Sequence, residues 1–159
     1  MSVGSPWRSL RAVFATLRLI HILAAIVWVG GSIMAQFYAR RLAAADPAHR
    51  LGFARDLRFV AAKVFVPSAF VVLGAGVWMV IDAPGFDFED TFVVIGLSAV
   101  GVSLATALLY LIPGVGKAIG LMTSGRGPEA GVVIRRVNLA ARAVIVVLLI
   151  AVWAMVVKP

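Results

Sequence analysis

Residues 17–34 read LRLIHILAAIVWVGGSIM, an almost wholly apolar stretch that contains a single histidine, His21. An α-helix rises about 1.5 Å per residue, so roughly 20 apolar residues cross the hydrocarbon core of a bilayer. The uncharged run extends over residues 19–39, between Arg18 and Arg40, and is long enough to do so. This stretch therefore predicts a membrane-spanning helix with an imidazole inside it.

The rest of the chain repeats this apolar pattern. Of its 159 residues 62% are hydrophobic and 14% are charged, and a soluble domain of this size could not bury so much apolar surface. Three further segments are nearly free of charge, at 64–81, 91–116 and 143–157. We predict an all-α polytopic membrane protein, a bundle of four transmembrane helices that forms one domain over residues 1–159. The expected helices cover about residues 14–40, 60–81, 91–112 and 137–157.

Two features of the composition exclude classes of function. The chain has no cysteine, which excludes thiolate metal sites, iron–sulfur clusters and covalently attached haem. Its formal charge of +8 would also suit a nucleic-acid partner, but no nucleic-acid-binding motif is present. In a membrane protein, basic residues indicate the topology and contact lipid head groups. We therefore expect that the protein has no nucleic-acid partner.

The basic residues are distributed unevenly between the two sides of the predicted bundle. Eleven lie in or beside the first and third connections: Arg40, Arg41, Arg50, Arg55, Arg58, Lys63, Lys117, Arg126, Arg135, Arg136 and Arg142. Four lie on the other side: Arg8, Arg11, Arg18 and Lys158. Because cytoplasmic connections carry an excess of lysine and arginine, this asymmetry predicts that both termini are extracytoplasmic.

One face of the first predicted helix carries the histidine. Residues three and seven positions apart share a helical face, and the face of His21 includes Ala24, Trp28, Gly31 and Ala35. Small residues permit the close approach of another helix or of a flat cofactor, and an ionisable group inside a membrane is a candidate functional site. We expect His21 to face the bundle interior and Trp28 to line the same cavity. The alternative is a neutral histidine that only packs against a neighbouring helix.

The chemistry of imidazole narrows what His21 could bind. Neutral imidazole is a ligand for haem iron and for copper. The other histidine, His49, lies in the first connection and is expected at the opposite side, so one chain does not supply two histidines to one haem. A second axial ligand would be a methionine, a water or a group from a second subunit. Arg18 or Arg11 would pair with haem propionates, because a guanidinium fork matches a carboxylate.

The pattern His21-x6-Trp28-x-Gly30-Gly31 resembles the first transmembrane helix of a small bacterial four-helix membrane family of unknown function. That family is similar to the membrane domain of the copper-resistance protein D family and, more distantly, to the membrane protoporphyrinogen oxidase that carries haem b. The likeness covers about residues 15–82. It implies a helical bundle in the bacterial cytoplasmic membrane with His21 as the haem or metal contact.

The leading functional hypothesis is a non-enzymatic or redox-accessory membrane protein that binds haem b, or alternatively copper, through His21. Trp28, Gly31 and Arg18 are the further expected cofactor contacts. One alternative is a membrane oxidoreductase of the protoporphyrinogen oxidase type. Another is a copper transporter, or a structural or assembly subunit without a cofactor. The expected partners are the lipid bilayer and a second copy of the chain or another membrane subunit.

Overall fold

The computed structural model describes residues 6–82 and 87–157, and every regular element in these ranges is helical. In chain order the elements are α1 (Pro6–Ala25), the π-helical turn η1 (Ile26–Gly30), α2 (Gly31–Arg41), the 3-10 turn η2 (Leu42–Ala44), α3 (Pro47–Val60), the π-helical turn η3 (Ala61–Phe65), α4 (Val66–Asp82), α5 (Thr91–Thr106), the π-helical turn η4 (Ala107–Leu111), α6 (Ile112–Thr123) and α7 (Gly127–Val157). They form four long helical spans, each long and apolar enough to cross a membrane. The predicted all-α class with four such helices is confirmed.

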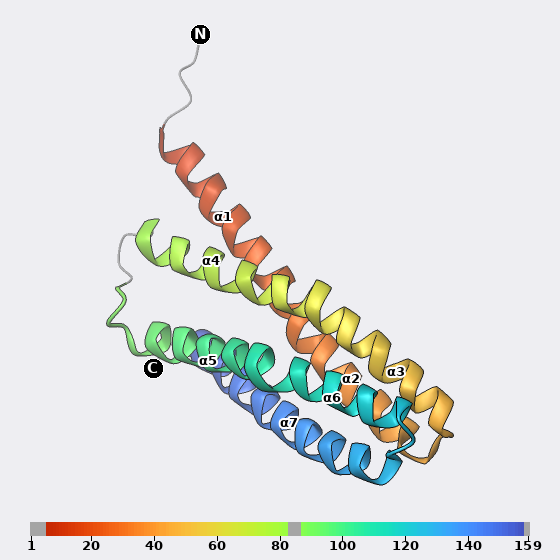
Figure 1. The fold of residues 1–159 in the computed structure, drawn as a ribbon. Coiled ribbons are helices and arrows are strands. Elements are labelled where there is room, and N and C mark those ends of the chain that lie inside the picture. Colours follow the sequence, from red (N-terminus) through yellow and green to blue (C-terminus); the bar gives the residue numbers. More distant parts are fainter. Residues whose placement is uncertain (1–5, 83–86, 158–159) are drawn as a thin grey trace.

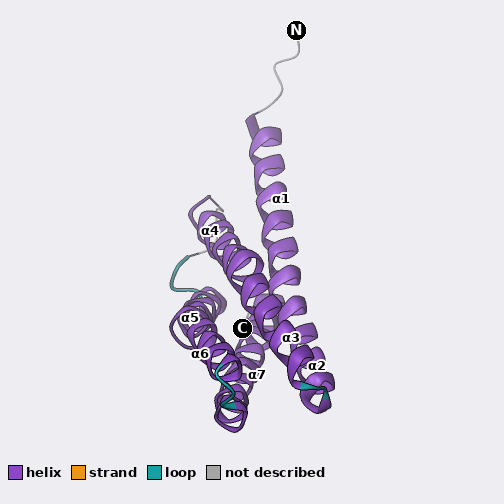
Figure 2. Cartoon of the chain, turned by 45° about the vertical axis from the view of Figure 1, so that its right-hand side comes forward, coloured by secondary structure: helices purple, strands orange, loops and turns teal. Residues whose placement is uncertain are grey.

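The four spans run in alternating directions and form a bundle (Figure 1). The α2–α3 and α6–α7 connections lie together at one end, which we call the basic end after Arg40, Arg41, Arg50 and Arg126. The start of α1, the end of α4, the start of α5 and the end of α7 lie toward the other end. Figure 2 shows α1 extending away from α5 and α7 there, while its lower part packs against α4.

The helices extend beyond the apolar segments. The first begins at Pro6 rather than near residue 14, and the others are longer at the basic end. The second span begins at Pro47 rather than near residue 60, because the arginine-rich connection itself forms α3. The third span continues through Pro113 to Thr123 instead of ending at residue 112, and the fourth begins at Gly127 rather than near residue 137. The length of an uncharged run shows which part of a helix is compatible with the hydrocarbon core of a bilayer. The residues at which a helix begins and ends depend instead on capping and on backbone hydrogen bonds.

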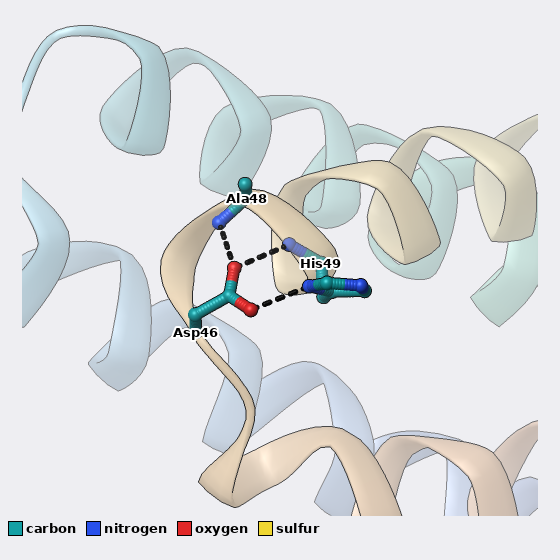
Figure 3. A network of polar contacts seen from close by, with 3 residues as sticks. All are labelled: Asp46, Ala48 and His49. Atoms are coloured by element: carbon teal, nitrogen blue, oxygen red, sulfur yellow. Dashed lines mark hydrogen bonds and ion pairs between the residues drawn. The ribbon is translucent and has the colours of Figure 1, made fainter.

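Asp46 caps the N-terminus of α3 and explains why that helix starts there (Figure 3). Its Oδ1 accepts hydrogen bonds from the backbone N–H groups of Ala48, at 2.9 Å, and His49, at 3.0 Å, and Pro47 occupies the first helical position. The His49 ring also contacts the Asp46 carboxylate. The backbone N–H of His49, together with its ring, holds the pKa of Asp46 below its usual value.

Three of the four spans contain a π-helical turn. Two of these turns, η3 and η4, come just before Pro67 and Pro113. A proline lacks an N–H group and its ring collides with the carbonyl four residues earlier, so the wider turn accommodates it. The structure thus has an irregular turn next to Pro67, where a proline weakens the regular helical hydrogen bonding. The turn η1 contains no proline and ends at Gly30, beside Gly31.

The core is small and receives side chains from all four spans. It consists of Trp28, Ala69, Val72, Val100, Leu104 and Leu148. Many large apolar side chains lie on the outer surface instead, including Leu109 at 80% exposure and Ile81 at 70%. Contact of such side chains with water is unfavourable, whereas contact with hydrocarbon is not. The outer surface of the bundle therefore suits lipid.

Candidate functional site

His21 lies between α1 and α4, where it is partly buried. Its Nδ1 is 2.9 Å from the backbone carbonyl oxygen of Val72. A carbonyl only accepts hydrogen bonds, so Nδ1 carries a hydrogen and donates it, and in a neutral ring the lone pair is then on Nε2. The ring also lies over Gly76, where a Cβ atom would be 3.3 Å from Cε1 of His21. We expected His21 to face the bundle interior, and the structure places its ring against α4, the contact that the alternative of a packing histidine also requires.

Trp28 has a different environment, although it lies on the same helical span. It is 5% exposed, belongs to the core, and lines a central cavity of about 100 Å³. His21 does not line this cavity, so the expectation that the two side chains share it is wrong. Six residues separate His21 from Trp28, and the π turn η1 begins between them and changes the helical phase. Trp28 belongs to the core, whereas the His21 ring contacts Val72 and Gly76 of α4. The cavity volume is below the roughly 300–1,000 Å³ of typical cofactor sites.

Gly31 is a packing position in the structure. A Cβ atom there would lie 2.8 Å from Cζ of Phe65, so the absence of a side chain lets this ring rest against the helix backbone. Ala24 packs against the core, and Ala35 lines the central cavity. The prediction that the small residues of this face meet other helices is confirmed. The space beside Gly31 that a flat cofactor would need is filled by Phe65.

Arg18 lies three residues before His21 on α1, and its side chain is exposed. Within the described residues no salt bridge engages it. Since positions three apart share a helical face, its guanidinium is on the same side of α1 as the imidazole. Helical spacing thus places Arg18 on the same side of α1 as His21, whereas Trp28 packs in the core and Gly31 packs against Phe65.

The described residues supply few metal-binding side chains near His21. They contain no group of three or more histidine, cysteine, aspartate or glutamate side chains that could hold a metal ion. His49 lies in α3 at the basic end, where it contacts Asp46 (Figure 3). The expectation that the two histidines lie on opposite sides of the bundle agrees with this placement.

The central cavity is surrounded by all three π turns, a feature that sequence reasoning missed. Its lining includes Trp28 of η1, Phe65 of η3 and Leu111 of η4. Ser103, which also lines it, is fully buried, and its Oγ has no hydrogen-bond partner among the described residues. In native structures a buried hydroxyl normally has a hydrogen-bond partner, which here would be a polar atom of a ligand or a water. Pro67, Pro113 and the Gly30–Gly31 pair were the available signals for these turns.

A second, outer cavity of about 400 Å³ lies at the basic end. Its polar lining residues are Arg40, Arg50, Arg135, Asn138 and Arg142. The Nε of Arg142 donates a hydrogen bond of 3.2 Å to Oε1 of Gln36, which links α7 to α2. Sequence reasoning used these arginines only to assign topology. The spacing of residues 135, 138 and 142, which places them on one helical face, could have identified the α7 part of this cluster.

Comparison of the chain with models of protein families, with curated proteins and with solved structures finds no match.

Proposed function

We propose that this chain is a non-enzymatic integral membrane protein of the bacterial cytoplasmic membrane that binds haem b through His21. The hydrogen bond from Nδ1 of His21 to the Val72 carbonyl is the observation that supports this proposal. Histidines that ligate metals commonly donate their other ring N–H to a carbonyl or carboxylate, which fixes the tautomer and orients Nε2 toward the metal. The four apolar spans and the exposed apolar surface support the membrane location.

The donor set favours haem over a bare copper ion. A protein-bound metal ion generally needs three or four protein ligands, and the described residues contain no group of three or more histidine, cysteine, aspartate or glutamate side chains that could hold one. Haem supplies four ligands of its own and requires only an axial side chain, which His21 would provide. Arg18 would pair with a propionate. Haem bound there would supply one-electron redox chemistry.

The placement of His21 implies a second polypeptide in this proposal. His21 does not line the central cavity, and the volume of this cavity is below that of typical cofactor sites. A haem held by His21 therefore needs another wall and a second axial ligand, and we propose that a second copy of the chain or a partner membrane subunit provides them. Of the four expected cofactor contacts, only His21 and Arg18 remain in this proposal.

The same hydrogen bond favours one other candidate function, a structural or assembly subunit without a cofactor. In that case the His21–Val72 bond and the contact of the ring with Gly76 join α1 to α4. An interhelical hydrogen bond inside a membrane is worth about 0.6–2 kcal/mol, which is enough for a structural role.

Replacing His21 by alanine tests the proposal. Wild-type protein purified in mild detergent from haem-supplemented cells should show a Soret band, and His21→Ala should retain less than a tenth of it with an unchanged helical circular dichroism spectrum. Gly76→Ala places a Cβ atom 3.3 Å from the His21 ring and should shift or weaken the band, whereas Gly74→Ala has open space and should not. A colourless wild type, or a His21→Ala variant with an undiminished band, would contradict haem binding at His21. A colourless wild type whose unfolding temperature falls on His21→Ala substitution would favour the structural candidate.

We also propose that the basic end is cytoplasmic and that both termini are extracytoplasmic. The asymmetry of eleven to four in lysine and arginine supports this orientation. Alkaline phosphatase fused after Pro159 should be active, and green fluorescent protein fused at the same place should be dark. The same reporters inserted at Arg126, in the α6–α7 connection, serve as the control and should give the reverse result. A fluorescent fusion after Pro159 would contradict the orientation and leave the bundle unaffected.

A further inference from the structure

We propose that the outer cavity at the basic end binds the phosphate head group of an anionic phospholipid, with its acyl chain on the apolar floor of the cavity. The proposal rests on the proposed membrane location and is independent of haem and His21. Four arginines supply the polar part of the site: Arg40 from α2, Arg50 from α3, and Arg135 and Arg142 from α7. Three separate helices thus direct cations to one cavity.

The charge of this cavity is not balanced by the protein. None of its lining residues is acidic. The salt bridges among the described residues lie elsewhere, between Asp46 and His49 and between Glu129 and Arg126. The guanidinium groups carry like charges, so an anion among these four exposed side chains would reduce their mutual repulsion. Phosphate suits them because two parallel N–H groups of a guanidinium match two of its oxygens.

One of the four arginines, Arg142, is hydrogen-bonded to a neighbouring helix. The Nε of Arg142 is engaged by Gln36, while no hydrogen bond among the described residues is made by its Nη atoms. Asn138, one turn earlier on the same face of α7, adds an amide to the lining. The site therefore combines one hydrogen-bonded cation, three further cations and a neutral donor.

The position of the site along the bundle favours a lipid over a soluble anion. Arg40 directly follows the uncharged run 19–39, and Arg142 directly precedes the uncharged run 143–157. Both arginines thus mark the border between hydrocarbon-compatible and polar helix, which is the level of the head groups. Basic pockets between helices at the cytoplasmic surface are typical sites for anionic lipid head groups.

The floor of the outer cavity is apolar and continues inward. Phe53, Leu57 and Val115 contribute to it. Leu57, Val115, Val137 and Asn138 line both the outer and the central cavity, so the two adjoin. An anionic head on the arginines and an apolar chain on this floor fit the arrangement. A free phosphate ion would use only the charged half of the site.

Two pairs of neighbouring arginines provide a matched test. Arg40 and Arg135 line the cavity, whereas the adjacent Arg41 and Arg136 line neither cavity. Delipidated protein in dodecyl maltoside is titrated with dioleoyl phosphatidylglycerol, dioleoyl phosphatidylcholine or inorganic phosphate, and bound lipid is counted by native mass spectrometry. We expect one tightly bound phosphatidylglycerol per chain and an at least tenfold weaker affinity for phosphatidylcholine. R40Q/R135Q should weaken phosphatidylglycerol binding about tenfold or more, and R41Q/R136Q less than threefold.

Each other outcome overturns a defined part of the proposal. Equal losses in the two double variants would show a diffuse basic surface in place of a site. Full displacement of the lipid by inorganic phosphate at similar concentrations would make a free phosphate the ligand and overturn the lipid assignment. No retained phosphatidylglycerol would overturn the site itself. Because His21→Ala should bind the lipid as the wild type does, failure of haem binding and failure of this site are separately visible.

Discussion

Replacing Trp28 by alanine should lower the free energy of unfolding by about 2–4 kcal/mol. Trp28 is 5% exposed and packs against core residues including Ala69 and Leu104. Removal of a buried indole normally costs about 3–5 kcal/mol in soluble proteins. In a membrane the transfer component is smaller, because the unfolded helices remain in hydrocarbon, and the loss of packing around the enlarged cavity dominates.

A matched tryptophan on the outer surface controls for the loss of the indole itself. Trp153 of α7 is 58% exposed, so Trp153→Ala should change the free energy of unfolding by less than about 0.5 kcal/mol. Both variants can be measured by titrating purified protein from a mild detergent into sodium dodecyl sulfate. Equal effects at the two positions would mean that Trp28 does not belong to a packed core.

Replacing Gly31 by alanine should destabilise the bundle by about 1–3 kcal/mol, a typical cost of overpacking. The added Cβ would lie 2.8 Å from Cζ of Phe65, a separation that real Cβ contacts do not show, so the ring or the helix must move. At Gly30 a Cβ atom meets nothing within 4 Å. Gly30→Ala should therefore be neutral or slightly stabilising, because alanine has the higher helix propensity.

The assignment of this effect to Phe65 can be tested with a double-mutant cycle. If the clash with the ring causes the loss, Gly31→Ala should cost much less in a Phe65→Ala background than in the wild type. The unfolding measurements used for Trp28 serve here as well. Additive effects of the two substitutions would show that Gly31 is constrained by something other than this ring.

Some features of the candidate site could be predicted from the sequence, and others could not. The orientation of His21 toward another helix was predictable, because an ionisable group on a helix with small neighbours is costly toward lipid. The identity of its partner, the Val72 carbonyl, was not, since backbone acceptors have no sequence signature and in regular helices are already bonded. The separation of His21 from the cavity of Trp28 was also unpredictable, because regular 3.6-residue periodicity does not register a π turn.

The sequence by itself determined the four apolar spans, their alternating directions and the concentration of arginine at one end. These properties depend on local apolar length and charge, which can be read directly from the sequence and compared with the thickness of a bilayer core. Only the tertiary structure decided that Phe65 fills the space beside Gly31, that three π turns meet at one cavity, and that Arg40, Arg50, Arg135 and Arg142 line another. The physical reason is that helix phase, rotation and register are set by side-chain packing between distant segments, and a bilayer stabilises each span without fixing how the spans face one another.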